Sequence, residues 1–186
     1  MRQPGPRLAL SVSHKHGRAL LALSLSWLCL AAPGSAAPAT TPCALDPRPH
    51  LVVVAEQHRL SLCEQQREVR SFSVRLARNG LGKRRSGDGK LPLGRYPLGT
   101  PQASARYGTF IPIGYPTSQQ RGSGYTGGDI GVHGPDRRVR WLGSLVNLVD
   151  TTNGCVGIAT DGEMKDLVAW ISEHHAALID LQEASP

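Results

Sequence analysis

Two residues of this sequence, each beside a glycine, have side chains suited to acyl transfer. Cys155 follows Gly154 at a predicted junction between a loop and a strand, and His133 ends a short apolar run just before Gly134. A free thiol has a pKa of about 8.5 and is mostly protonated at neutral pH, but a nearby imidazole can accept its proton and release a nucleophilic thiolate. The pair predicts a cysteine nucleophile with a histidine as general base. The alternative is a buried structural cysteine and a packed core histidine.

The glycine before Cys155 meets a second requirement of acyl transfer. Because glycine lets other groups approach the backbone closely, main-chain N–H groups around Gly154 and Cys155 could bind the oxyanion that forms when a thiolate attacks a carbonyl. The other histidines after residue 37 are weaker base candidates, since they lie near two further cysteines or late in a predicted helix. They are His50, His58, His174 and His175.

The remaining cysteines fit an exported chain. Residues 1–37 combine a basic start, an apolar run over residues 19–32 and a small-residue segment, which predicts a secretory signal peptide cleaved near Ala36 or Ala37. The apolar run is shorter than the ~20 residues of a membrane span, so we expect no stable span after cleavage; an uncleaved anchor is the alternative. Cys43 and Cys63 are close in sequence and are predicted to pair in an oxidising compartment, which leaves Cys155 as the free thiol.

The charge balance argues against a nucleic-acid partner. Residues 1–37 hold four of the 21 Lys and Arg and none of the 14 Asp and Glu, so their removal lowers the formal net charge from +7 to +3. No basic stripe is interleaved with aromatic residues. A zinc site is disfavoured because closely spaced ligands are missing, and a phosphate-binding loop because residues 80–83 are followed by Arg84 rather than Ser or Thr. We therefore predict no metal.

The sequence predicts one β-rich domain that positions these side chains. The four prolines of residues 38–50 predict an extended lead-in, and residues 51–182 predict a single domain. Apolar runs predict strands at residues 51–55, 58–62, 69–77, 95–98, 109–113, 129–133, 145–149 and 156–159. A helix is predicted from Asp161 to about Leu181, because Thr160 and Glu163 form a capping-box pattern and apolar residues recur at helical spacing. The predicted fold class is mainly β with a C-terminal α-helix.

At these residues the sequence resembles the L,D-transpeptidase, or YkuD-type, catalytic domain. The family pattern is His-Gly after a strand, then Ser/Thr-x-Gly-Cys and an apolar residue, which corresponds here to His133-Gly134 and to Thr-Asn-Gly-Cys-Val at residues 152–156. Residues 87–96 resemble the family's G-x-x-x-T-P-x-G-x-Y element, residues 111–116 its next strand and residues 160–167 the start of its helix. The resemblance covers about residues 50–171 and rests on the order of these elements.

The sequence departs from the family pattern in four ways. Gly157 stands where many members have arginine, Asn153 replaces a common histidine, and Leu91 replaces the usual threonine before proline. The spacing from His133 to Cys155 is also longer than in many members. The change at Gly157 puts one substrate or oxyanion contact in doubt. We therefore expect a divergent member that keeps the thiol and the imidazole.

The resemblance implies a β-sandwich-like domain that acts on peptidoglycan in the periplasm or cell envelope, with roles in cell wall organisation and cell shape. Cys155 would attack the carbonyl between residues three and four of a stem tetrapeptide, His133 would protonate the leaving D-Ala, and an amine of a second stem would resolve the thioester. The main-chain carbonyl of Gly134 would orient the histidine, and Thr152, Asn153 and Gly154 would bind the oxyanion or the substrate. No metal or organic cofactor is implied.

Two other functions stay open in the sequence. Water instead of an amine could resolve the thioester, which would make the protein an L,D-carboxypeptidase or a hydrolase of wall-attached proteins. A non-catalytic cell-wall-binding module is the second, and the departures at Gly157 and Asn153 support it. The acceptor, the arginines that bind substrate and the oligomeric state also stay open.

Overall fold

The computed structural model describes residues 42–184, so the predicted signal peptide and residues 38–41 of the lead-in lie outside the described residues. Residues 42–45 form a turn and residues 47–49 bend, so this part of the lead-in is not extended. Cys43 and Cys63 form a disulfide across a sequence separation of 20, and both are fully buried. Among the helices of residues 42–184, none has the length and apolar composition needed to cross a membrane.

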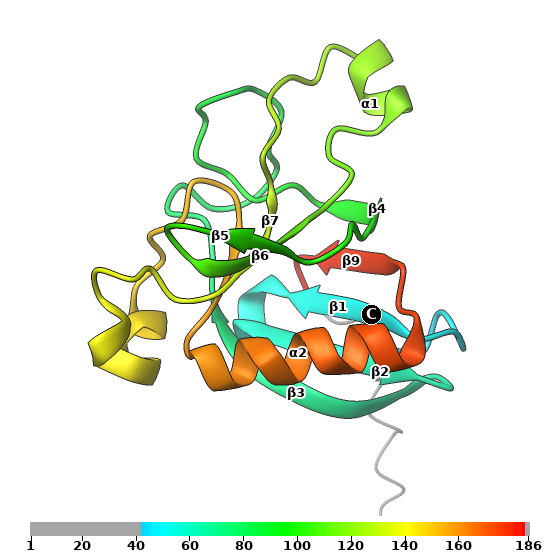
Figure 1. Cartoon of the computed structure of the whole chain (residues 1–186). Helices are drawn as coiled ribbons and strands as arrows, with labels where there is room; N and C mark the ends of the chain where they lie inside the picture. Colours follow the sequence, from blue (N-terminus) through cyan, green and yellow to red (C-terminus); the bar gives the residue numbers. More distant parts are fainter. Residues whose placement is uncertain (1–41, 185–186) are drawn as a thin grey trace, which may run out of the picture. The chain divides into compact units, whose positions relative to one another are not determined.

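Nine strands of the described residues form one mixed sheet in the order β4-β9-β1-β2-β3-β8-β7-β6-β5 (Figure 1). The strands are β1 His50–Val54, β2 Arg59–Glu64, β3 Arg67–Arg75, β4 Gly94–Pro97, β5 Gln102–Ser104, β6 Gly108–Pro112, β7 Gly131–His133, β8 Val156–Ile158 and β9 Leu178–Gln182. The helical segments are η1 Ala55–Gln57, α1 Ser118–Gly122, η2 Arg140–Leu148 and α2 Asp161–His174. The pairs β1/β9 and β7/β8 are parallel and the others antiparallel.

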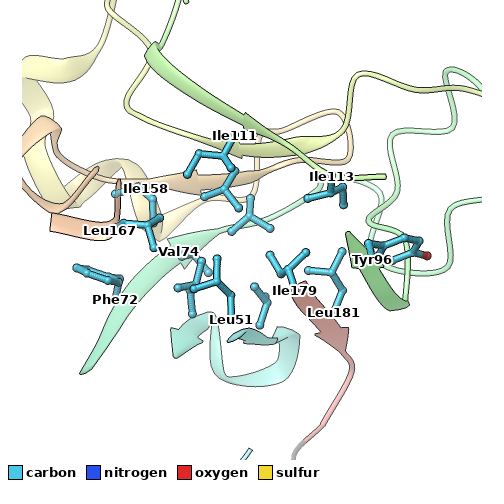
Figure 2. Close-up of a cluster of buried hydrophobic side chains, with 14 of the residues drawn as sticks. Leu51, Phe72, Val74, Tyr96, Ile111, Ile113, Ile158, Leu167, Ile179 and Leu181 are labelled. Carbon is cyan, nitrogen blue, oxygen red and sulfur yellow. The ribbon is translucent and has the colours of Figure 1, made fainter. Parts of the chain in front are cut away.

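The sheet curls so that its two halves share one hydrophobic core. Leu51 of β1 and Ile179 of β9 face Ile111 of β6 and Ile158 of β8 across this core (Figure 2), and Leu167 of α2 joins the same cluster. Alternate strand residues point to one face, which explains why apolar residues from strands far apart in the sequence meet. The prediction of a mainly β, sandwich-like fold with a helix near the C-terminus is confirmed.

The predicted helix is correct at its start and wrong at its end. The Thr160 side chain accepts from the Glu163 main chain and the Glu163 side chain accepts from the Thr160 main chain, which is the predicted capping box. The helix ends at His174, and His175 has a left-handed φ of 52°. Residues 178–181, predicted as the end of this helix, belong instead to β9, because pairing with both β1 and β4 satisfies their backbone. The sequence could not distinguish the two, because a short apolar run is compatible with both the helical and the strand periodicity.

The strand predicted at residues 145–149 is also wrong. This segment belongs mostly to η2, and Gly143 interrupts it with a φ of 56°. The side chains of Trp141, Leu145, Leu148 and Val149 are 61–78% exposed. Apolar composition alone predicted the strand, but no neighbouring strand pairs with this segment within the described residues. The other predicted strands are present with shifted ends, whereas β5 and α1 were not predicted.

Candidate active site

The register of β7 and β8 brings the two candidate catalytic residues to one cavity. The strands are parallel, with Val132 opposite Val156 and His133 opposite Gly157. His133 is the last residue of β7, and Cys155 directly precedes β8. Both residues line a cavity of about 770 Å³.

The hydroxyl of Thr152 holds the loop before Cys155 through two hydrogen bonds to the backbone of that loop. The Thr152 Oγ1 donates to the carbonyl oxygen of Cys155 at 2.6 Å and accepts from the main-chain N–H of Gly154 at 3.4 Å. Gly154 has a φ of 121°, and a Cβ there would lie 2.8 Å from the carbonyl oxygen of Lys90. Glycine is therefore required at this turn. Thr152 is buried, while Asn153 is exposed on the lining of the cavity.

His133 is fixed by a main-chain hydrogen bond and an aromatic neighbour. Its Nδ1 lies 2.7 Å from the carbonyl oxygen of Gly134, so Nδ1 carries a proton and Nε2 is the acceptor of the neutral ring. The ring stacks on Tyr107, with centroids 3.9 Å apart and an interplanar angle of 27°. A Cβ at Gly134 would lie 2.6 Å from the carbonyl oxygen of Tyr107. Glycine at position 134 thus allows the Tyr107 segment to cover the imidazole.

Burial keeps both groups in their neutral forms. The pKa of His133 is lowered from 6.5 to about 4, chiefly by burial and in smaller part by nearby Arg75 and Arg106, while the bond to Gly134 acts in the opposite direction. Burial also raises the pKa of the Cys155 thiol, although Lys83 acts in the opposite direction. At neutral pH the site therefore holds a thiol and a neutral imidazole rather than an ion pair. The Cys155 Sγ lies 3.5 Å from the carbonyl oxygen of Asp129.

Basic side chains line the same cavity, and the sequence had not singled them out. Lys83 is buried and pairs with Asp88 at 2.8 Å, and Arg106 pairs with Asp136 at 2.8 Å. Arg75 is only 4% exposed. In the sequence, Lys83 stands out only as part of the rejected phosphate-binding loop at residues 80–83, and no local pattern marks Arg75. Within residues 42–184, no group of three or more His, Cys, Asp or Glu side chains is arranged to hold a metal ion.

Comparison with solved structures identifies relatives of this fold. The helical cell shape determining protein Pgp2 from Campylobacter jejuni is 19% identical, with a TM-score of 0.61 over 75% of this chain and 49% of that chain. Bd1075 from Bdellovibrio bacteriovorus is 21% identical, with a TM-score of 0.54 over 75% and 49%. The chain thus spans about half the length of these two proteins. No curated protein matches the sequence.

Comparison with protein families gives a match over most of the chain. The family model of the L,D-transpeptidase catalytic domain matches residues 48–179, a span that includes both His133 and Cys155. The nine-stranded fold is consistent with this match. The chain therefore belongs to the L,D-transpeptidase catalytic-domain family.

Proposed function

We propose that this protein is a cysteine acyltransferase of the L,D-transpeptidase type that acts on peptidoglycan stem tetrapeptides. The observation that carries the proposal is one cavity lined by both Cys155 and His133, in which Nδ1 of His133 bonds to the Gly134 carbonyl 2.7 Å away. That bond leaves Nε2 as the proton acceptor, which is what a general base requires. A binding module would not require this tautomer in a cavity that also holds a free thiol.

In the first step, Nε2 of His133 takes the proton of Cys155 as Sγ attacks the carbonyl of the third stem residue. The tetrahedral oxyanion is bound by the main-chain N–H of Cys155, because the N–H of Gly154 already bonds to Thr152 at 3.4 Å. The C–N bond to the fourth residue then breaks. His133 returns its proton to the departing amine, and a thioester on Cys155 remains.

In the second step, an amine of another stem peptide attacks the thioester. His133 takes a proton from this amine as the new amide forms, and then returns it to Sγ as the thiolate leaves. The imidazole must be neutral at the start of both steps. The pKa of about 4 provides this at neutral pH, since almost all of the His133 population is then unprotonated.

We also propose that residues 1–37 are a cleaved signal peptide, that residues 51–182 form the catalytic domain, and that the protein acts in the periplasm or cell envelope. The Cys43–Cys63 disulfide supports this, because such bonds persist in oxidising compartments. A partly buried, protonated Cys155 is also less easily oxidised than an exposed thiolate.

The test is incubation of the full chain with purified disaccharide tetrapeptides, followed by mass spectrometry. Cross-linked dimers that have lost D-Ala indicate transpeptidation, whereas tripeptides alone indicate hydrolysis. Cys155→Ser should lose activity by about a thousandfold or more, because a hydroxyl is a far weaker nucleophile. Retained turnover in that variant would refute the assigned nucleophile.

His133→Asn tests the base and has a matched control. His175→Asn removes a histidine at a left-handed position where asparagine is well tolerated, so it should leave activity unchanged. His133→Asn should lose activity by at least a hundredfold. Equal activity of the two variants would exclude His133 as the base.

A further inference from the structure

Arg75, Gly157 and His133 form a row across three neighbouring strands. Arg75 lies opposite Gly157 in the β3/β8 pair, and His133 lies opposite Gly157 in the β7/β8 pair. Side chains of residues opposite one another point to the same face of a sheet. Arg75 and His133 therefore flank Gly157 on the face that lines the cavity.

Gly157 makes room for the Arg75 side chain. A Cβ at position 157 would lie 2.8 Å from Nε and 3.2 Å from Nη2 of Arg75. The arginine thus lies directly over the glycine, in the space that a side chain at position 157 would fill. The departure from the family pattern at Gly157 is therefore matched by an arginine from β3.

The Arg75 guanidinium has no anion within ion-pair distance in residues 42–184, and Asp136 favours its charge only from farther away. Its Nε is buried without a hydrogen-bond partner, and Arg75 takes part in none of the ion pairs of residues 42–184. The other buried cation of the cavity, Lys83, is paired with Asp88. A guanidinium stays charged even when it is buried, and a buried charge without a partner is costly. An anionic ligand would remove this cost.

We propose that Arg75 binds the terminal carboxylate of the donor peptide and so restricts the reaction to the last residue of the stem. The proposal rests on the proposed function. The amine that leaves must lie against His133 to receive its proton, and the amine and the carboxylate of an α-amino acid share one carbon. A leaving residue placed against His133 therefore brings its carboxylate toward the neighbouring Arg75. The guanidinium fork matches a carboxylate in a bidentate pair.

The test measures binding apart from turnover, in the full chain carrying Cys155→Ala. Two probes are compared: a stem tetrapeptide that ends in a free D-Ala carboxylate and the same peptide with a C-terminal amide. We expect the carboxylate form to bind roughly 10- to 100-fold more tightly, as a charge-assisted pair provides. Arg75→Met should abolish this preference, and Arg75→Lys should restore only part of it.

Arg70→Met is the matched control, because Arg70 is an exposed arginine of the same strand outside the cavity. It should keep the full preference for the carboxylate. The thermal unfolding of each variant shows whether it is folded. If Arg75→Met is unfolded, Arg75→Lys and Arg75→Gln give the same comparison.

The outcomes separate this proposal from the proposed function. If the unsubstituted chain turns over the peptide and Arg75→Met still prefers the carboxylate, the Arg75 proposal is wrong and the acyltransferase stands. If the preference depends on Arg75 but no turnover occurs, the anion site stands and the proposed function is wrong. If the Cys155→Ala chain binds neither peptide, both are wrong.

Discussion

Two groups of charged residues in this protein are built in opposite ways. In the first, which we call the Arg95 cluster (Asp46, Arg48, Arg95 and Asp180), every charge has a partner. Arg95 donates to Asp180 through Nε at 2.8 Å and through Nη2 at 2.7 Å, and to Asp46 through Nη1 at 3.0 Å. Arg48 also bonds to Asp46. In the cavity, by contrast, Arg75 takes part in none of the ion pairs of residues 42–184, and its Nε is buried without a hydrogen-bond partner.

The directions of the pKa shifts express this difference. In the Arg95 cluster, hydrogen bonds from Arg48 hold the pKa of Asp46 well below its usual range, and Asp180 raises the pKa of Arg95. The charged forms are therefore favoured. In the cavity, burial lowers the pKa of His133 and of Arg75 and raises that of Cys155, so each charge is disfavoured there; His133 and Cys155 are neutral, while the Arg75 guanidinium stays charged without a partner. Paired charges stabilise the fold, whereas unpaired ones are available for a ligand and for proton transfer.

The largest expected effect is a pH dependence of stability caused by His133. The pKa of His133 is about 4 in the folded protein, and that of a solvated histidine, as in the unfolded chain, is 6.5. Between pH 4 and pH 6.5, therefore, the unfolded chain binds a proton that the folded protein does not. The stabilising contribution is complete above pH 6.5 and falls as the pH drops toward 4, by about 3 kcal/mol in total. About 2 kcal/mol of this should be lost between pH 7 and pH 5. Urea denaturation at both pH values measures it.

His133→Asn should lack this dependence, and His175→Asn should retain it. Asp46, Asp88 and Asp136 have lowered pKa values, so their contributions to the free energy of unfolding are lost only at more acidic pH. Comparing the stability of the variants between pH 7 and pH 5 therefore isolates the contribution of His133 from theirs. If unsubstituted protein and His133→Asn lose the same free energy of unfolding, burial does not hold the imidazole neutral.

The second prediction concerns the disulfide close to Asp46 in the sequence. Replacing Cys43 and Cys63 with alanine should lower the free energy of unfolding by about 3 kcal/mol, because the bond closes a loop with a sequence separation of 20. Alkylation of Cys155 by iodoacetamide, followed by intact mass, should proceed at an unchanged rate. A changed alkylation rate would mean that the disulfide region and the cavity around Cys155 are coupled.

The third prediction compares the two arginines directly. Arg95→Met leaves Asp46 and Asp180 without their shared partner and should cost about 2 kcal/mol, a value reduced because the Arg95 side chain is 39% exposed. Arg75→Met breaks no ion pair and should change the free energy of unfolding by less than about 1 kcal/mol. Thermal and urea unfolding measure both. Equal destabilisation would show that Arg75 has an unrecognised structural role.

The sequence predicted the features that depend on neighbouring residues and missed those that depend on strand pairing. The capping box fixed the start of α2, and residues beside glycines marked Cys155 and His133, which lie in one cavity. The end of α2 was missed because strand pairing decides it: residues 178–182 are held between β1 and β4, about which local periodicity says nothing. Arg75 was missed for the same reason, since only the β3/β8 register places it over Gly157.

The smallest predicted effect tests what keeps His133 neutral. Tyr107 reaches the imidazole from the turn between β5 and β6, and its ring covers the imidazole at 3.9 Å. Tyr107→Ala should admit water and raise the pKa of His133 by about one unit from its value of about 4, which corresponds to about 1.4 kcal/mol. Titration of the ring nitrogens by NMR measures this value. Tyr125→Ala, a change outside the cavity lining, should leave it unmoved. An unchanged pKa in Tyr107→Ala would mean that the sheet alone excludes water from the imidazole, and that the aromatic cover serves substrate binding instead.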